Sequence, residues 1–137
     1  MPPDEGRVAE ARSWLLKATG DLRAAEVDLA ARPPLLEDVV FPAQQAAEKA
    51  LKGFLTWHLL TFRKTHNLVE LGEACAAVDH GLESLLARAA PLTEYAWKFR
   101  YPGDIDMPSI DEASQALAIS REVVDAILER LPQETHP

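Results

Sequence analysis

Apolar residues recur every three or four positions along most of this chain, a period that predicts amphipathic helices. The first stripe covers residues 7–31, and Pro33 with Pro34 ends it because proline lacks the amide hydrogen that a helix needs. A second helix is predicted to begin between residues 37 and 42, since proline is tolerated in a first helical turn. It is predicted to end near residue 61.

A third, short helix is predicted after Asn67, which is a typical N-cap residue and is followed by Glu70 at capping-box spacing. Cys75 falls on the apolar face of this helix, so we expect a small buried side chain rather than a nucleophile. A fourth stripe over residues 82–100 contains Pro91, which predicts a kink or two abutting helices.

The segment Ser109-Ile110-Asp111-Glu112 has capping-box spacing and opens a fifth helix that ends before Pro132. No segment alternates with period two for long enough to form a strand. We therefore predict an all-α fold, an up-and-down bundle of four long helices plus one short helix, with a kinked fourth helix. Residues 1–137 are expected to form a single domain with its core at about 7–131.

The second predicted helix has two distinct faces. The apolar residues of one narrow face are Ala43, Ala47, Ala50, Phe54 and Trp57. Gln45, Lys49 and Lys52 fall on the opposite face, which we expect to be presented to something outside the monomer. Glu48 lies on the ridge between the two faces, four residues before Lys52, where an ion pair can form.

Charge distinguishes the segment 41–66 from the rest of the chain. It contains four basic residues and one acidic residue, a balance of +3, whereas the whole chain carries 14 basic and 22 acidic residues and a net charge of −8. A locally basic surface on an acidic protein favours an anionic ligand or a contact with a partner. The alternative is a solvated helix face without a specific role.

The composition narrows the function classes further. One cysteine allows no internal disulfide and fits a reducing compartment. The N-terminus lacks an apolar signal-like segment and no run is long enough to span a membrane, so we expect a cytoplasmic protein. The net negative charge argues against general DNA binding, which depends on clustered Lys and Arg.

The histidines at positions 58, 66, 80 and 136 show no spacing that would place two metal ligands on one helix face, so a metal site is not expected. The sequence also contains no P-loop and no dinucleotide-binding fingerprint, and no cofactor is expected. Asp104 and Asp106 are more typical of a solvated turn than of a cation site.

The strongest candidate for anion binding is the segment Arg63-Lys64-Thr65-His66, which runs into the capped helix start at Asn67. Free N–H groups and the helix dipole attract a phosphate at such a position. The alternative is that His66 packs over the helix start while Arg63 and Lys64 remain in water.

Aromatic residues cluster at the end of the fourth stripe. They are Tyr95, Trp97, Phe99 and Tyr101, and Arg100 lies among them. Such a density is typical of the edge of a core, although Arg100 and Tyr101 are also candidates for contact with a phosphate or a base.

Four sequence features occur in a characteristic order. They are Trp14-Leu15 with Ala18 and Asp21-Leu22; Gln44-Gln45-Ala46-Ala47-Glu48-Lys49-Ala50-Leu51-Lys52; Thr65-His66-Asn67-Leu68 with Leu71; and Arg100-Tyr101-Pro102. This ordered set resembles the HEPN domain family of small prokaryotic helical proteins. The resemblance implies a bundle of four or five helices, commonly dimeric, often encoded beside a minimal nucleotidyltransferase and proposed to bind nucleotides.

Some members of that family are ribonuclease toxins with an R-x(4–6)-H motif. Here Arg100 is followed by Y-P-G-D-I-D-M without a histidine, and only two residues separate Arg63 from His66. The resemblance therefore favours a nucleotide-binding or partner-binding subunit of a two-component or toxin–antitoxin system over an enzyme. The alternatives are a ribonuclease that uses Arg100 and His66 without the usual motif, and a purely structural, antitoxin-like interaction protein.

Overall fold

The computed structural model describes residues 4–103 and 106–137, which form α-helices and short 3-10 helices and contain no strand. The α-helices are α1 (Glu5–Ala30), α2 (Glu37–Trp57), α3 (Leu68–Val78), α4 (Glu83–Ala89) and α5 (Ile110–Arg130). The 3-10 helices are η1 (His80–Leu82), η2 (Ala90–Ala96) and η3 (Gln133–Thr135). The predicted all-α fold class is confirmed. Within these described ranges, no helix combines the length and apolar character needed to cross a bilayer.

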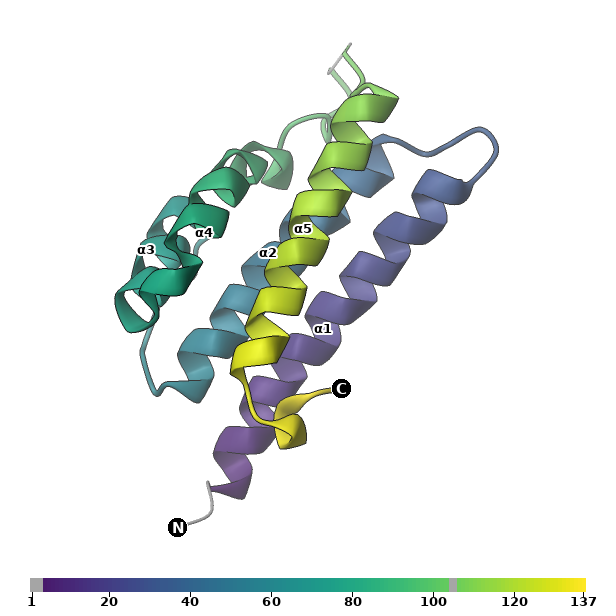
Figure 1. The fold of residues 1–137 in the computed structure, drawn as a ribbon. Coiled ribbons are helices and arrows are strands. Elements are labelled where there is room, and N and C mark those ends of the chain that lie inside the picture. Colours follow the sequence, from purple (N-terminus) through teal and green to yellow (C-terminus); the bar gives the residue numbers. More distant parts are fainter. Residues whose placement is uncertain (1–3, 104–105) are drawn as a thin grey trace.

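The three long helices α1, α2 and α5 lie side by side, and the pair α3 and α4 covers one flank of them (Figure 1). The predicted apolar face of α2 is buried at Ala43, Ala47, Ala50 and Phe54, whereas Trp57 is only partly buried. The contact between α1 and α2 is the most extensive in the fold.

Gly53 makes the close approach of α1 and α2 possible. A Cβ at this position would lie 3.1 Å from Trp14 Cβ and 3.3 Å from Leu15 Cδ2, closer than ordinary van der Waals contact. Glycine therefore lets the two backbones approach where any other residue would force them apart.

The start of α3 is capped as predicted, but not by a closed capping box. Asn67 Oδ1 accepts hydrogen bonds from the N–H groups of Val69 and Glu70. Glu70 does not return to the Asn67 N–H, which donates to Thr65 Oγ1, because the Glu70 carboxylate is bound to Arg63. At α5 one half of the predicted capping box is confirmed, since the Ser109 hydroxyl accepts the hydrogen bond of the Glu112 N–H. The Glu112 carboxylate accepts instead from the Tyr95 hydroxyl.

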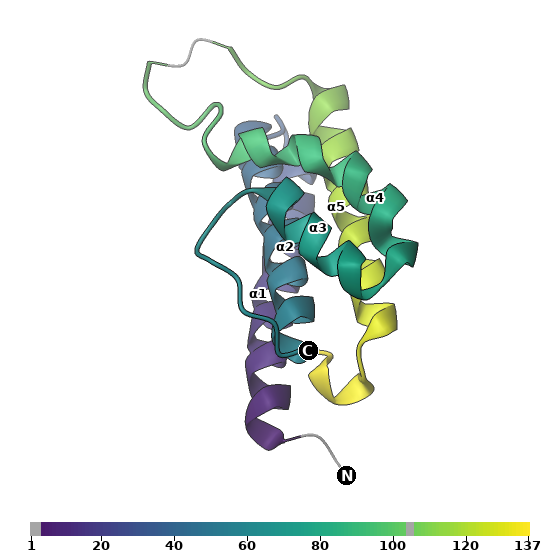
Figure 2. The same cartoon turned by 90° about the vertical axis from the view of Figure 1, so that its left-hand side faces the viewer.

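Residues 58–67, which we call the strap, run back along α2 instead of forming a short turn (Figure 2). Phe62 lies near Lys52, and His66, further along the strap, contacts Glu48 one turn earlier in α2. Because the strap returns, α3 runs in the same direction as α2, and the Cys75 thiol reaches the Leu51 carbonyl oxygen at 3.7 Å. The strictly alternating up-and-down order is therefore wrong at this connection.

The fourth predicted helix is shorter than expected. Only Glu83–Ala89 is α-helical, and Ala90–Ala96 continues as the 3-10 helix η2 with Pro91 in its first turn. The bundle thus has three long helices rather than four. Pro91 removes one helical hydrogen bond, as predicted, and the chain responds with tighter turns.

Helix α2 ends at Trp57 instead of near residue 61 because the chain turns out of the helix there. Leu59 has φ 58°, in the left-handed region. Its N–H donates to the Thr56 carbonyl and that of Leu60 donates to the Leu55 carbonyl. This pattern is a Schellman cap, in which glycine normally occupies the position of Leu59.

Replacing Leu59 by glycine is expected to stabilise the fold by about 1 kcal/mol, because a side chain in the left-handed region costs roughly that much. Leu59 is 72% exposed, so little packing is lost with its side chain. Thermal or urea unfolding followed by circular dichroism measures the change. Leu60→Gly is the matched control, and it should destabilise the fold, since Leu60 has no positive φ. Equal effects of the two substitutions would contradict this account of the cap.

Candidate functional site

A buried carboxylate, Glu48, is the centre of the most elaborate polar cluster in the described part of the chain. Its side chain is only 4% exposed. It accepts hydrogen bonds from Gln44 Nε2 at 3.1 Å, Lys52 Nζ at 3.0 Å and His66 Nδ1 at 2.8 Å. Gln44, Glu48 and Lys52 are four residues apart, so α2 places all three on one ridge, and the strap adds His66 to them.

Glu48 is held in its charged form. Burial alone would raise the pKa of this carboxyl, but the hydrogen bonds from His66, Gln44 and Lys52 outweigh that effect and lower the pKa below its ordinary value. The group at the centre of the cluster is therefore a carboxylate at neutral pH, and it can only accept hydrogen bonds.

Lys52 does not face outward, and that prediction is wrong. The side chain is buried, and its ammonium group pairs with Glu48. The Nζ atom also lies 5.5 Å from the ring centroid of Trp14 and 5.9 Å from that of Phe62. The strap covers this part of α2, so a side chain that would be solvated on an isolated helix is enclosed by aromatic rings.

His66 is the exposed member of the cluster. Its side chain is 63% exposed although Nδ1 is bound to Glu48, and Gln44 Nε2 donates to its backbone carbonyl. Since the carboxylate only accepts, Nδ1 must carry the proton of this hydrogen bond. The other ring nitrogen, Nε2, is then the acceptor in the neutral imidazole, so the cluster selects one tautomer.

The remaining polar residues of the predicted outer face have internal partners. Lys49 Nζ lies 2.6 Å from Asp21 Oδ2, an ion pair that joins α2 to α1. Gln45 is half-buried, and its amide donates to Gln44 Oε1 at 2.7 Å. Lys49 therefore contributes to helix packing rather than to a presented surface, which corrects the expectation for this face.

Arg100 packs against the same ridge of α2 that His66 contacts. Its guanidinium carbon is 3.6 Å from the ring centroid of Phe41, and Nη1 donates to the Ala96 carbonyl at 3.1 Å. Phe41 precedes Glu48 by two helical turns, about 10 Å. The structure thus brings Arg100 and His66 to one side of the molecule without placing them in one contact. Tyr101 is exposed beside Arg100.

The start of α3 does not offer the backbone donors that the phosphate hypothesis required. The Leu68 N–H donates to Thr93 Oγ1, and the next two N–H groups donate to Asn67. Arg63 binds the Glu70 carboxylate at 2.7 Å. Arg63 and Lys64 are exposed, and their contact with a ligand stays a prediction. The N–H groups at the start of α3 already have partners within the chain.

The remaining residues singled out in the sequence are the aromatic cluster at the end of η2, Cys75 and the two aspartates at 104 and 106. Tyr95 and Phe99 are buried and stacked, so the aromatic cluster is mainly a core edge, while Trp97 is exposed. Cys75 is buried as predicted. Asp104 lies outside the described residues, and Asp106 is exposed. Residues 4–103 and 106–137 contain no group of three side chains able to hold a metal ion.

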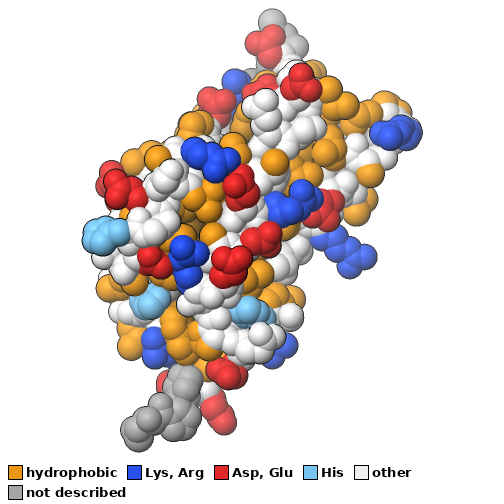
Figure 3. Space-filling model, in the orientation of Figure 1, with side chains coloured by type: hydrophobic (Ala, Val, Ile, Leu, Met, Phe, Trp, Pro, Cys, Tyr) orange, Lys and Arg blue, Asp and Glu red, His pale blue; other side chains and the backbone are white. Residues whose placement is uncertain are grey.

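Charges on the face formed by α4 and α5 are mixed rather than gathered by sign, as Figure 3 shows. Arg88 pairs with Glu122 there, and Arg121 pairs with Glu26 of α1. This face therefore offers no patch of one sign that would attract a charged ligand.

The sequence missed three contributors to the site: Trp14, Phe62 and Phe41, whose rings cover Lys52 and support Arg100. No local signal marks them, because their roles depend on the path of the strap and of the segment after η2. Gln44 could have been found, since Gln44, Glu48 and Lys52 recur every fourth residue among alanines.

A family model described as HEPN domain matches residues 11–131, nearly the whole chain. The resemblance drawn from four short sequence features is thereby confirmed. No curated protein and no solved structure matches this chain.

Proposed function

This chain belongs to the HEPN family, and from that premise we propose that it is a non-catalytic binding subunit. It acts in the cytoplasm as a homodimer beside a minimal nucleotidyltransferase, in a two-component or toxin–antitoxin type system. It offers the His66 side of α2 to a nucleotide or to that partner protein.

The observation that supports this proposal is the exposed imidazole of His66, fixed from below by the buried carboxylate of Glu48. A side chain held in one orientation loses little freedom when it binds a ligand. Arg63 and Lys64 extend from the same strap, and Arg100 lies two turns away along α2. These cations complement an anionic ligand, and phosphate groups are the anions that a nucleotide supplies.

The same pair supports a second candidate, a ribonuclease in which His66 is the general base and Glu48 positions it. A carboxylate that orients a histidine is a common arrangement in acid–base catalysis. Binding is favoured because Arg100 is engaged with Phe41 and the Ala96 carbonyl instead of with His66.

Calorimetric titration with ATP tests the binding function. The wild-type protein is expected to bind. His66→Ala should bind about two- to tenfold more weakly, because Nε2 of the neutral imidazole can accept a hydrogen bond from a ribose hydroxyl or from the adenine amino group, and such a bond contributes about 0.5–1.5 kcal/mol. Arg121→Ala, which removes an exposed cation on the α5 face, is the matched control and should bind like wild type. Lys49 and Lys52 are unsuitable for this test since both form internal ion pairs.

Negligible heat for wild-type protein, with and without a co-purified nucleotidyltransferase, would contradict the ligand role. Incubation of the same proteins with RNA separates the second candidate. Cleavage that is lost in His66→Ala and retained in Arg121→Ala would establish the ribonuclease instead.

A further inference from the structure

Arg100 is held flat against the ring of Phe41 and turns its other face to solvent. The guanidinium carbon lies 3.6 Å from the ring centroid, and Nη1 donates to the Ala96 carbonyl at 3.1 Å, so two contacts fix the side chain. The residue is nevertheless exposed. A guanidinium that packs on an aromatic ring with one face can receive a second planar group on the other. Arg100 is therefore prepared for stacking.

The chain reaches this position through a residue in an unfavourable backbone conformation. Phe99, directly before Arg100, has φ 70°, in the left-handed region where residues other than glycine are uncommon. Its ring is buried and stacks on Tyr95, whose hydroxyl donates to Glu112 of α5. These contacts hold the bend that turns Arg100 onto α2. Strained residues of this kind cluster at binding sites, so the strain at Phe99 indicates that the position of Arg100 serves a function.

Arg100 and the strap offer different chemistry to the two ends of a ligand. Arg100 presents a flat face, whereas Lys64 is an exposed cation and His66 an exposed imidazole. Phe41, which Arg100 contacts, and Glu48, which His66 contacts, are two turns apart along α2, about 10 Å. A ligand that touches both ends must be extended, with a planar group at one end and negative charge at the other. A nucleoside di- or triphosphate has this form.

We propose that the ligand is a purine nucleoside di- or triphosphate whose base stacks on the free face of the Arg100 guanidinium, while its sugar and phosphates extend along α2 toward His66 and Lys64. Arg100 then recognises the base rather than the phosphates. Any base can stack in this way, but a purine covers more of the guanidinium than a pyrimidine does. Such binding presupposes the nucleotide-binding function proposed above and adds the ligand class and its orientation.

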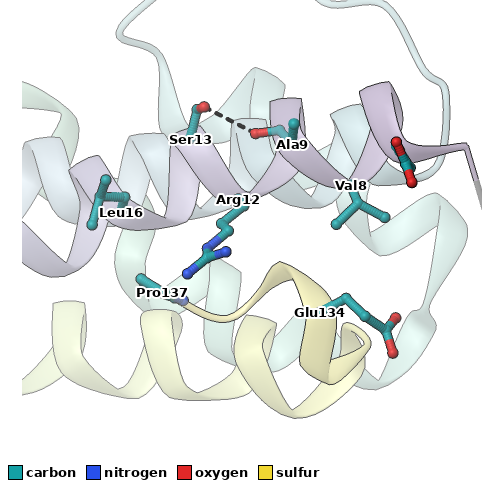
Figure 4. Close-up of a pocket in the computed structure, with 8 residues that line it drawn as sticks. Val8, Ala9, Arg12, Ser13, Leu16, Glu134 and Pro137 are labelled. Carbon is teal, nitrogen blue, oxygen red and sulfur yellow. Dashed lines mark hydrogen bonds between the residues drawn. The ribbon is translucent and has the colours of Figure 1, made fainter.

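A groove of about 700 Å³ lies between α1 and the C-terminal segment, away from Arg100 (Figure 4). One cation, Arg12, and two carboxylates, Glu5 and Glu134, are among the residues that line it. The carboxylates would repel a phosphate chain, so this groove is a poor site for a nucleotide. Arg12 therefore provides a matched control for Arg100, because both are exposed arginines and the same substitution can be made at each.

Calorimetric titration with ATP, UTP and inorganic tripolyphosphate tests the role of Arg100. Wild-type protein should bind ATP at least about fivefold more tightly than tripolyphosphate, because stacking of one base contributes that much or more, and UTP should lie between them. Arg100→Lys keeps the charge but removes the flat face. Its affinity for ATP should fall to that for tripolyphosphate, which should itself change less than about twofold. Phe41→Leu, which removes the supporting ring, should weaken ATP binding in the same selective way, and Arg12→Lys should bind all three ligands like wild type.

The orientation of the bound nucleotide is tested by NMR. Stacking brings the protons of the adenine ring close to the δ protons of Arg100, so NOEs between them are expected. NOEs from the adenine to the His66 ring instead, equal affinities of the wild type for ATP and tripolyphosphate, or equal losses of both ligands in Arg100→Lys would overturn the stacking but not the binding of ATP. Negligible heat with all three ligands would overturn both the stacking and the binding function.

Discussion

Replacing Glu48 by alanine is expected to lower the free energy of unfolding by about 3–5 kcal/mol, the loss typical of breaking a buried ion pair from one side. The carboxylate is the common acceptor for Gln44, Lys52 and His66. Without it the Lys52 ammonium remains buried between Trp14 and Phe62 with no counter-charge. Urea unfolding followed by circular dichroism measures the change.

Two control variants distinguish this explanation from general damage. Glu122→Ala removes an exposed carboxylate that pairs with Arg88, and it should cost less than about 1 kcal/mol. Glu48→Ala combined with Lys52→Met should be more stable than Glu48→Ala alone, because the stranded charge is then gone. A double variant as unstable as the single one would show that the loss does not come from Lys52.

The contribution of Glu48 should also disappear in acid. Burial would raise the pKa of this carboxyl, but the hydrogen bonds from His66, Gln44 and Lys52 lower it in the folded protein. A group with a lowered folded pKa stabilises the fold above its unfolded pKa and loses that contribution as the pH falls through the folded pKa. The stability difference between wild type and Glu48→Gln should therefore be largest near neutral pH and shrink below about pH 4.

The helix caps and the apolar face of α2 could be predicted from the sequence, because each depends on residues that are close together in the chain. Asn67 and Ser109 are caps because their side chains reach N–H groups two or three residues ahead, whatever the rest of the chain does. The apolar face of α2 was likewise predicted by helical period alone. Pro91 was expected to disturb the fourth helix, but the choice between a kink and a 3-10 turn depends on packing that the sequence does not encode locally.

The internal ion pairs of Lys49 and Lys52, on the polar face of α2, could not be predicted in the same way. An isolated helix would leave Lys49 and Lys52 in water, and period arguments assume that a polar face meets solvent. Here Asp21 of α1 neutralises Lys49, and the strap places Phe62 over Lys52. Both partners are far from α2 in sequence or follow it by an irregular path, so only the three-dimensional structure pairs them.

This arrangement links the stability of the bundle to the geometry of the site. Trp14 packs on α2 from α1 and contacts Phe62 and Lys52, and Lys52 in turn holds Glu48, which orients His66. The exposed imidazole thus depends on how closely α1 approaches α2. A substitution where α1 crosses α2 should therefore change the position of the His66 side chain, although it alters no atom of the site.

Replacing Gly53 by valine tests this dependence and is expected to lower the free energy of unfolding by about 2–3 kcal/mol. The Cβ alone would lie 3.1 Å from Trp14 Cβ and 3.3 Å from Leu15 Cδ2, and the two methyl groups of valine need further space. Helix α1 must then move away from α2 and carry Trp14 with it. Urea unfolding measures the loss, and the imidazole resonances of His66 should shift in the NMR spectrum.

Gly20→Val is the matched control, because it makes the same substitution in a helix interior where nothing lies within 4 Å of the new Cβ. Measured where the wild type is monomeric, it should change stability by no more than about 0.5 kcal/mol and leave the His66 resonances in place. If Gly53→Val were as mild as Gly20→Val, α1 and α2 would not be held together at Gly53. A destabilised Gly53→Val with unchanged His66 resonances would instead show that the crossing and the site are independent.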